Sequence, residues 1–185
     1  MYYGNVYHSS IVDGPGVRVS LYTSGCRKHC KGCHNPETWD FKYGKEYTEE
    51  TEKEILDAMN HDYIKGFTFC GGDPMEEETQ RVIVGLVKKI RDLYPDKDIW
   101  SWTGYEYVDL QKGGLKYCEV TNELLSYIDV LVVGGFELDK RDISDNNRWR
   151  GSTNQRVIDM NETRKQGKIV MLAGIPNNEP YENYF

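Results

Sequence analysis

Residues 24–35 of this chain read SGCRKHCKGCHN and place three thiols, Cys26, Cys30 and Cys33, within eight residues. The other two of the five cysteines, Cys70 and Cys118, lie far along the chain and are expected to be buried small residues. A cubane iron–sulfur cluster normally takes one thiolate for each iron, so three cysteines leave one iron open to another ligand. The stretch therefore predicts a four-iron, four-sulfur (4Fe-4S) cluster, and it makes Cys26, Cys30 and Cys33 the candidate metal ligands and catalytic residues.

Zinc is the alternative occupant of this loop, because His29 or His34 could complete a tetrahedral site with the thiols. Structural zinc sites usually join two short Cys or His pairs that are far apart in sequence, whereas here there is one compact group. A noncatalytic module, holding zinc or an iron–sulfur cluster that only carries electrons, remains the alternative to an enzyme. Five cysteines do not make the disulfide framework of a small secreted protein, so we expect reduced thiols and a cytoplasmic protein.

Length and charge narrow the class of protein further. A chain of 185 residues fits one domain, which we expect to span residues 1–185. The net charge is −7, and the basic residues are scattered, which is unlike a nucleic-acid binder. No apolar run is long enough to cross a bilayer, and the first residues lack the pattern of a secretion signal. We therefore expect neither nucleic acid nor a membrane among its partners.

Strand and helix patterns alternate along the chain. Residues 17–23 read VRVSLYT and have the alternation of a strand that runs straight into the cysteine loop. Strands alternating with helices predict a parallel sheet with right-handed crossovers, and hence an α/β fold. Further strands are expected over 66–70, 98–103, 129–133, 156–160 and 168–172, and helices from the Thr48 cap to about 61, from Pro74 to about 94 and over 121–127. The helix from Pro74 should begin with the charges of Glu76, Glu77 and Glu78 and bury an apolar stripe of Ile83, Leu86, Val87, Ile90 and Leu93.

A second sharp loop, GGDP, follows the expected strand 66–70. By itself such a loop is most often a tight turn before a helix. Its backbone beside Gly71 and Gly72 could also bind the amino or carboxylate end of an amino acid, with Asp73 as acceptor of the ammonium. Parallel α/β proteins bind ligands where strands end, so this loop, Thr103 and the cysteine loop are expected to meet at one mouth.

The run RWRGSTNQ at 148–155 is polar and cationic around one large aromatic residue. It could be an irregular loop in which Trp149 packs and the arginines are solvated. It could equally be a surface for a protein partner, because Trp and Arg are the usual anchors of such contacts. The residues alone leave both interpretations open.

Together these motifs resemble the radical S-adenosylmethionine superfamily, and more closely its glycyl-radical activases, in particular the activating proteins of anaerobic ribonucleoside-triphosphate reductase. CRKHCKGC has the superfamily spacing of three and then two residues between the cysteines. The resemblance covers nearly the whole chain. It extends to VDGPGVRVSLYTSGC at 12–26, NPETW at 35–39, GGDP at 71–74, WSWTGY at 100–105 and WRGSTNQ at 149–155.

The resemblance implies a single α/β domain built as an incomplete barrel of six β/α units. It implies two cofactors, the 4Fe-4S cluster and S-adenosylmethionine, with the methionine end held by the loop after residue 70. Two departures from the family pattern stand out: Gly32 replaces a common aromatic residue before the third cysteine, and Asp73 replaces a glutamate. The cofactor-binding residues implied are Gly32, Cys33, His34, Gly71, Gly72, Asp73 and Thr103.

The activity implied is reductive cleavage of S-adenosylmethionine to a 5′-deoxyadenosyl radical, which takes a hydrogen from a backbone glycine of the large reductase subunit. The implied partners are that subunit and an external one-electron reductant such as flavodoxin. An activase of another glycyl-radical enzyme, such as pyruvate formate-lyase, is the nearest alternative. The short chain and WRGSTNQ argue against it. Residues 13–16 and the loop around Trp149 are expected to border the entry of the partner's glycine loop.

Overall fold

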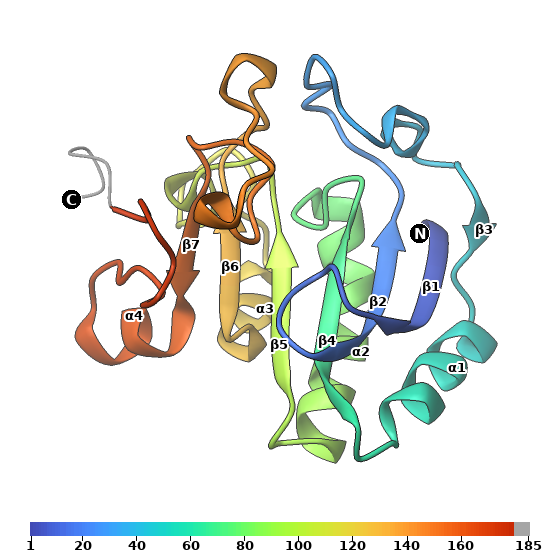
Figure 1. Ribbon diagram of the computed structural model, residues 1–185. Coiled ribbons are helices and arrows are strands. Elements are labelled where there is room, and N and C mark those ends of the chain that lie inside the picture. Colours follow the sequence, from blue (N-terminus) through green and yellow to red (C-terminus); the bar gives the residue numbers. More distant parts are fainter. Residues whose placement is uncertain (180–185) are drawn as a thin grey trace.

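The computed structural model describes residues 1–179 and shows a seven-stranded mixed sheet with four α-helices (Figure 1). The strand order is β3-β1-β2-β4-β5-β6-β7. The elements are β1 (Tyr2–Ser10), β2 (Val17–Thr23), β3 (Lys45–Glu46), α1 (Glu49–Met59), β4 (Ile64–Gly71), α2 (Glu77–Leu93), β5 (Asp98–Trp102), α3 (Thr121–Tyr127), β6 (Val130–Val133), β7 (Arg156–Asp159) and α4 (Met160–Gln166). Four 3-10 helices lie in the connections, at Pro36–Trp39, Tyr107–Leu110, Leu138–Lys140 and Asp145–Asn147.

Only the centre of the sheet is parallel. Strands β2, β4, β5 and β6 run in one direction, whereas β1, β3 and β7 pair antiparallel with their neighbours. The sheet is open, with β3 and β7 at its two edges. The fold is thus α/β as predicted, but the expected six parallel strands are wrong in number and direction.

The last two expected strands account for most of that difference. For the next strand to run parallel, the connection must cross back to the end of the sheet where the previous strand begins. The connection from β6 to β7, residues 134–155, contains only two 3-10 helices and stays at the end of the sheet where β6 finishes, so β7 returns antiparallel. Residues 168–172 form no strand; Met171 makes one isolated bridge to Ile158.

Strands β1 and β3 and helix α4 were missed for local reasons. β1 reads YYGNVYHSS, which is polar and rich in tyrosine, and much of it is exposed. β3 has two residues, and α4 has seven. Helix α1 begins after Thr48, whose hydroxyl accepts a hydrogen bond from the Thr51 amide, as the expected cap.

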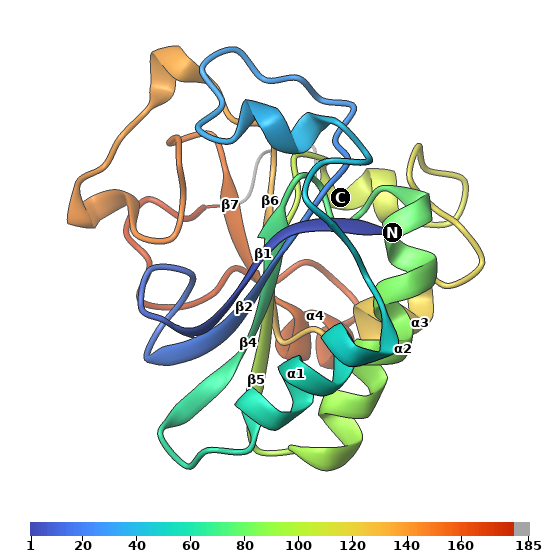
Figure 2. The same ribbon diagram turned by 90° about the vertical axis from the view of Figure 1, so that its right-hand side faces the viewer.

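The helices α1, α2 and α3 cover one face of the sheet (Figure 2). The predicted apolar stripe of α2 is largely confirmed, because Ile83, Leu86, Val87 and Ile90 are completely buried. Each such side chain contributes about 1.5–3 kcal/mol by leaving water. Leu93, expected in the same stripe, ends the helix and is 59% exposed.

The opposite face carries a smaller core. Side chains alternate between the two faces of a strand. Ile99 therefore joins the helix-side core, while its neighbour Trp100 packs on the other face with Val130, Val132 and Val157. None of the helices within residues 1–179 is both long and apolar enough to cross a membrane.

Candidate functional site

The carboxyl ends of the four parallel strands lie together at one end of the sheet, below a cavity of about 1020 Å³. The cysteine loop after β2 and the segment 134–155 after β6 lie above these strand ends (Figure 1). The expected convergence on one mouth is confirmed. Every predicted site residue lines this cavity: Cys26, Cys30, Gly32, Cys33, His34, Gly71, Gly72, Asp73 and Thr103.

The three cysteines of the loop are free thiols with different surroundings. Cys26 is buried, and Cys30 and Cys33 are half-buried. Burial, helped by the nearby Asp73 charge, raises the pKa of Cys26 to about 11. Metal binding requires the thiolate form. The Cys26 thiol therefore needs a positive centre such as iron beside it to lose its proton near neutral pH.

The donor set fits a cluster better than a single ion. Within residues 1–179, no three His, Cys, Asp or Glu side chains are gathered closely enough to hold one metal ion. A 4Fe-4S cluster does not require this, because each thiolate binds a different iron. Three free thiols at the wall of one cavity thus suit a cluster held at three of its corners.

Gly25, which precedes the first thiol, is required for packing. Its backbone has a φ of +100°, which favours glycine, and an added Cβ would lie 2.3 Å from a ring carbon of Phe41. The Gly25 and Cys26 amides donate to the carbonyls of Thr38 and Trp39, at 2.8 and 3.2 Å. The start of the cysteine loop is therefore clamped onto residues 38–41.

The GGDP loop is joined directly to the cysteine loop. The Gly72 amide donates to the Thr23 carbonyl at 2.7 Å, and the Asp73 amide donates to the Gly25 carbonyl at 2.8 Å. A Cβ at Gly72 would approach the Gly25 oxygen to 2.6 Å, so the second glycine is needed for this contact. These bonds continue the β2–β4 pairing beyond the ends of both strands.

The Asp73 carboxylate is buried and already has three donors. Its Oδ1 accepts from the Thr103 hydroxyl at 2.8 Å and the Met75 amide at 3.0 Å, and its Oδ2 accepts from the Gly104 amide at 2.8 Å. Burial raises the pKa of Asp73 to about 6, although these hydrogen bonds lower it. Asp73 therefore links the ends of β4 and β5, a role that its local sequence does not reveal.

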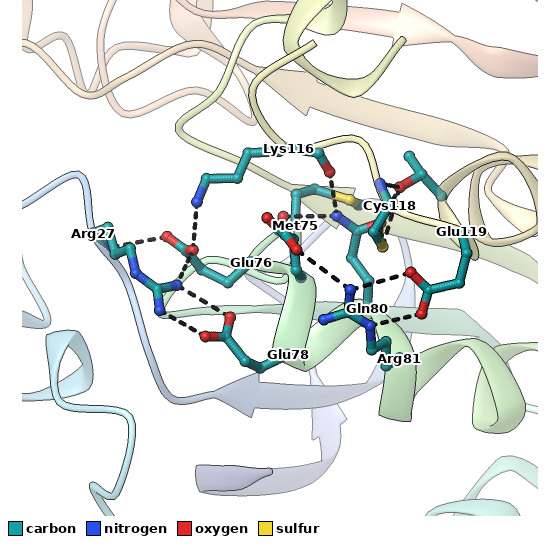
Figure 3. Close-up of polar contacts among 11 residues, drawn as sticks. Arg27, Met75, Glu76, Glu78, Gln80, Arg81, Lys116, Cys118 and Glu119 are labelled. Atoms are coloured by element: carbon teal, nitrogen blue, oxygen red, sulfur yellow. Dashed lines mark hydrogen bonds and ion pairs between the residues drawn. The ribbon is translucent and has the colours of Figure 1, made fainter. Parts of the chain in front are cut away.

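Glu76 was missed as a site residue, because its position suggested only a charge at the start of a helix. The structure starts α2 at Glu77, later than the predicted Pro74, and buries Glu76 completely as the residue before it. Its carboxylate contacts Arg27 and Lys116 (Figure 3). It also accepts a hydrogen bond from the Tyr105 hydroxyl. Burial raises the pKa of Glu76, but the hydrogen bonds from these residues outweigh it and hold the pKa below its usual range.

Cys70 and Cys118 are buried, as expected, and belong to no common cluster with the loop. Burial raises the pKa of Cys70 well above its ordinary value. The Cys118 thiol lies 3.6 Å from the side-chain oxygen of Gln80, within the packing between α2 and α3. Neither thiol has the surroundings of a reactive cysteine.

The comparisons with known proteins agree with this site. The 4Fe-4S single cluster domain family matches residues 12–158. Three relatives, from Enterobacteria phage T4, Pasteurella multocida and Escherichia coli K12, are called anaerobic ribonucleoside-triphosphate reductase-activating protein. Their identities are 37%, 41% and 39%, over 85% of this chain and 93%, 96% and 97% of the relatives. The chain belongs to this activating-protein family.

Membership of the activating-protein family establishes the cofactors and the class of enzyme. The predicted 4Fe-4S cluster is confirmed by the matched domain, and use of S-adenosylmethionine follows from the activase family. The chain is an enzyme, which argues against the alternative of a noncatalytic zinc or electron-carrier module.

In this member of the family, the segment 134–155 walls the cavity opposite the cysteine loop. Trp149 has a φ of +67°, and its ring packs edge-to-face on Trp100 with centroids 5.8 Å apart. Its carbonyl accepts from the indole of Trp102 at 2.8 Å. Trp149 is half-buried and also lines the cavity, so the packing interpretation holds for its ring, while the partner surface stays a prediction. Arg150 is buried rather than solvated, whereas Arg148 is exposed.

Proposed function

We propose that this protein activates anaerobic ribonucleoside-triphosphate reductase by forming a glycyl radical on its large subunit. The observation that carries the proposal is the cavity, where three free thiols and the GGDP loop face one another at the ends of parallel strands. The names of the relatives support the reductase as the partner. No observation favours pyruvate formate-lyase as the partner.

The cluster is assigned to Cys26, Cys30 and Cys33. When bound, the reduced cluster and S-adenosylmethionine supply a 5′-deoxyadenosyl radical by one-electron cleavage of the sulfonium. The methionine end is assigned to the loop of Gly71 and Gly72. Because the Asp73 carboxylate already accepts three hydrogen bonds, the backbone oxygens of this loop are the acceptors we assign to the ammonium, and Asp73 holds the loop in place.

The adenosine end is assigned to the opposite wall, at Gly32, Cys33 and His34. Gly32 has a φ of +77° and presents backbone rather than a side chain to the cavity, which suits a flat base. His34 is exposed and lines the same cavity, so its ring is free to stack. Thr103 acts indirectly, because its hydroxyl is donated to Asp73.

The partner's glycine segment is proposed to enter between Asp13 and the segment 134–155; of the expected residues 13–16, Asp13 lines the cavity, together with Val12 beside it. Val12 and Ile143 line the cavity yet are 72% and 86% exposed, which marks an apolar rim for a polypeptide. Asp13 is held by hydrogen bonds from Ser10 and Tyr22, which orders this side of the rim. The rim would be covered when the partner docks.

The remaining expectations extend the proposal. We infer an external one-electron reductant such as flavodoxin, because no second cysteine cluster is available in residues 1–179 to relay electrons. Five free thiols suit the reducing cytoplasm. We also propose that residues 1–185 form one radical S-adenosylmethionine domain, whose open sheet corresponds to the incomplete barrel of the superfamily; residues 180–185 lie outside the described residues.

The deciding experiment is anaerobic reconstitution with iron and sulfide, followed by reduction and assay of 5′-deoxyadenosine from S-adenosylmethionine. The Cys30→Ala variant is the control. Product that depends on Cys30, together with a glycyl radical detected by electron paramagnetic resonance (EPR) after the reductase subunit is added, is the expected result. A fully loaded cluster without product would overturn the activity, and a radical on pyruvate formate-lyase but not on the reductase would overturn the partner.

A further inference from the structure

The Glu76 carboxylate joins three segments that are distant in sequence, and Figure 3 shows two of its partners, Arg27 and Lys116. Its Oε1 accepts from the backbone amide of Arg27 at 2.9 Å and from the Tyr105 hydroxyl at 2.8 Å. Its Oε2 accepts from the Arg27 guanidinium at 2.5 Å and from the Lys116 ammonium at 2.7 Å. The cysteine loop, the end of β5 and the segment before α3 therefore meet on one carboxylate.

The contact with the Arg27 amide follows two backbone contacts between the same segments. Thr23, Gly25 and Arg27 are alternate residues leading into the cysteine loop. The Thr23 and Gly25 carbonyls accept from the Gly72 and Asp73 amides, and the Arg27 amide donates to the Glu76 carboxylate. Cys26 lies between the last two of these contacts. The peptide that follows the first thiol is thus fixed by Glu76 to the same loop that contains the GGDP motif.

Charged groups stabilise the contact between Glu76 and Arg27. The Glu76 side chain has no exposed surface, and that of Lys116 is 9% exposed. The exposed Glu78 carboxylate binds the other side of the Arg27 guanidinium at 2.6 Å, so two anions balance two cations. A buried carboxylate with four donors, two of them charged, is costly to disturb, because removing one charged partner leaves the other without its counter-charge and away from water.

We propose that Glu76 is a positioning residue for the cluster, holding the Cys26–Arg27 peptide in a constant relation to the GGDP loop. The inference rests on the proposed placement of the cluster on Cys26, Cys30 and Cys33. Glu76 then does more than precede a helix. Its carboxylate links the backbone next to Cys26 to the start of α2, so the cluster and the GGDP loop keep a constant relative position. Residues that orient metal ligands in this way typically change metal affinity when replaced.

The test compares two variants that differ only at Glu76. Lys116→Met removes the ammonium but leaves Glu76 bound to Arg27 and Tyr105. The double variant Glu76→Met/Lys116→Met also removes the carboxylate, without stranding a buried cation. Each reconstituted protein is challenged with an iron chelator, and cluster loss is followed by its visible absorbance. We expect about ten- to a hundredfold faster loss in the double variant than in Lys116→Met, and a broadened EPR spectrum of its reduced cluster.

Two controls separate positioning from general destabilisation. Glu78→Gln removes the exposed partner of Arg27 and is expected to keep the wild-type rate. Ile90→Ala opens a cavity in the last turn of α2, far from Glu76, and gives the rate expected from lowered stability alone. The inference would be overturned if the double variant lost its cluster no faster than Lys116→Met. It would also be overturned if the double variant lost its cluster no faster than an Ile90→Ala protein of equal stability. Failure of the wild-type protein to take up iron and sulfide would instead overturn the proposed function.

Discussion

Cys26 differs from the other two thiols of its loop in its surroundings. It is buried between the GGDP loop and residues 38–41, whereas Cys30 and Cys33 are half-buried along the cavity. Burial also raises its pKa to about 11. In the iron-free protein the three thiols should therefore behave as one protected and two accessible groups.

Alkylation of the iron-free protein should show this order. At pH 8 about one Cys26 side chain in a thousand is a thiolate, and the thiolate is the reactive form. We expect Cys30 and Cys33 to react with iodoacetamide at least about tenfold faster than Cys26, as measured by peptide mass spectrometry over time. Loading the cluster should protect all three. Equal rates for the three thiols in the iron-free protein would contradict this account of Cys26.

Asp73 should make the stability of the iron-free protein depend on pH. Its pKa is raised to about 6 by burial, so the folded state keeps a proton that the unfolded chain loses near pH 4. The contribution of Asp73 to the free energy of unfolding therefore falls as the pH rises through this window. Relative to Asp73→Asn, wild-type stability should fall by about 2 kcal/mol between about pH 4.5 and 7. Denaturant unfolding measures this, and a constant or rising difference would refute it.

At the scale of elements, the segment 134–155 determines both the end of the sheet and the wall of the cavity. It stays at the edge where β6 ends, which makes β7 antiparallel and places Trp149 over Trp100. Gln155 helps to hold it, accepting from the Gly151 amide and donating to the Gly134 carbonyl, both at 2.8 Å. The segment is thus a fixed wall with an exposed apolar tip at Ile143.

Replacing Trp149 should separate partner activation from cofactor cleavage. Trp149→Ala removes the ring between the cavity and Trp100, while the three thiols remain untouched. We expect the yield of glycyl radical on the reductase to fall about tenfold or more, as for loss of an aromatic anchor, with uncoupled 5′-deoxyadenosine formation within about twofold of wild type. Trp149→Phe is the matched control, since it keeps an aromatic ring. Loss of the cluster in Trp149→Ala would refute this division of roles.

At the scale of the whole molecule, one face of the sheet packs against helices, and the carboxyl ends of its parallel strands carry the site. The helix-covered core surrounds β4 and β5, which are paired on both sides. The outer strand β3 has two exposed residues and pairs only with Tyr2 and Tyr3. Stability should therefore decrease from the centre of the sheet toward this edge.

Hydrogen exchange should reveal that gradient. Amides of β4 and β5 open only with the global unfolding of the protein, whereas those of β3 open locally. We expect exchange at Lys45 and Glu46 to be at least about a hundredfold faster than in β4, as measured by mass spectrometry or nuclear magnetic resonance. Similar protection of β3 and β4 would show that the edge belongs to the same cooperative unit as the centre.

The sequence by itself determined the cluster loop, the order of the central elements and the edge at which the site forms. These follow from local signals: the spacing of three cysteines, the alternation in residues 17–23, the apolar stripe of α2 and the turns after each strand. Because parallel strands all end at one edge, local patterns were enough to bring Gly71, Asp73 and Thr103 to the cysteines.

Only the tertiary structure decided the direction of the edge strands and the contacts of the buried charges. The direction of β7 depends on the path of residues 134–155, which have no periodic pattern to reveal it. The roles of Asp73 and Glu76 depend on partners that lie some 30 to 50 residues away, at Thr103, Lys116 and Arg27. A carboxylate's task is set by the donors that folding brings to it, and those donors leave no signature in its local sequence.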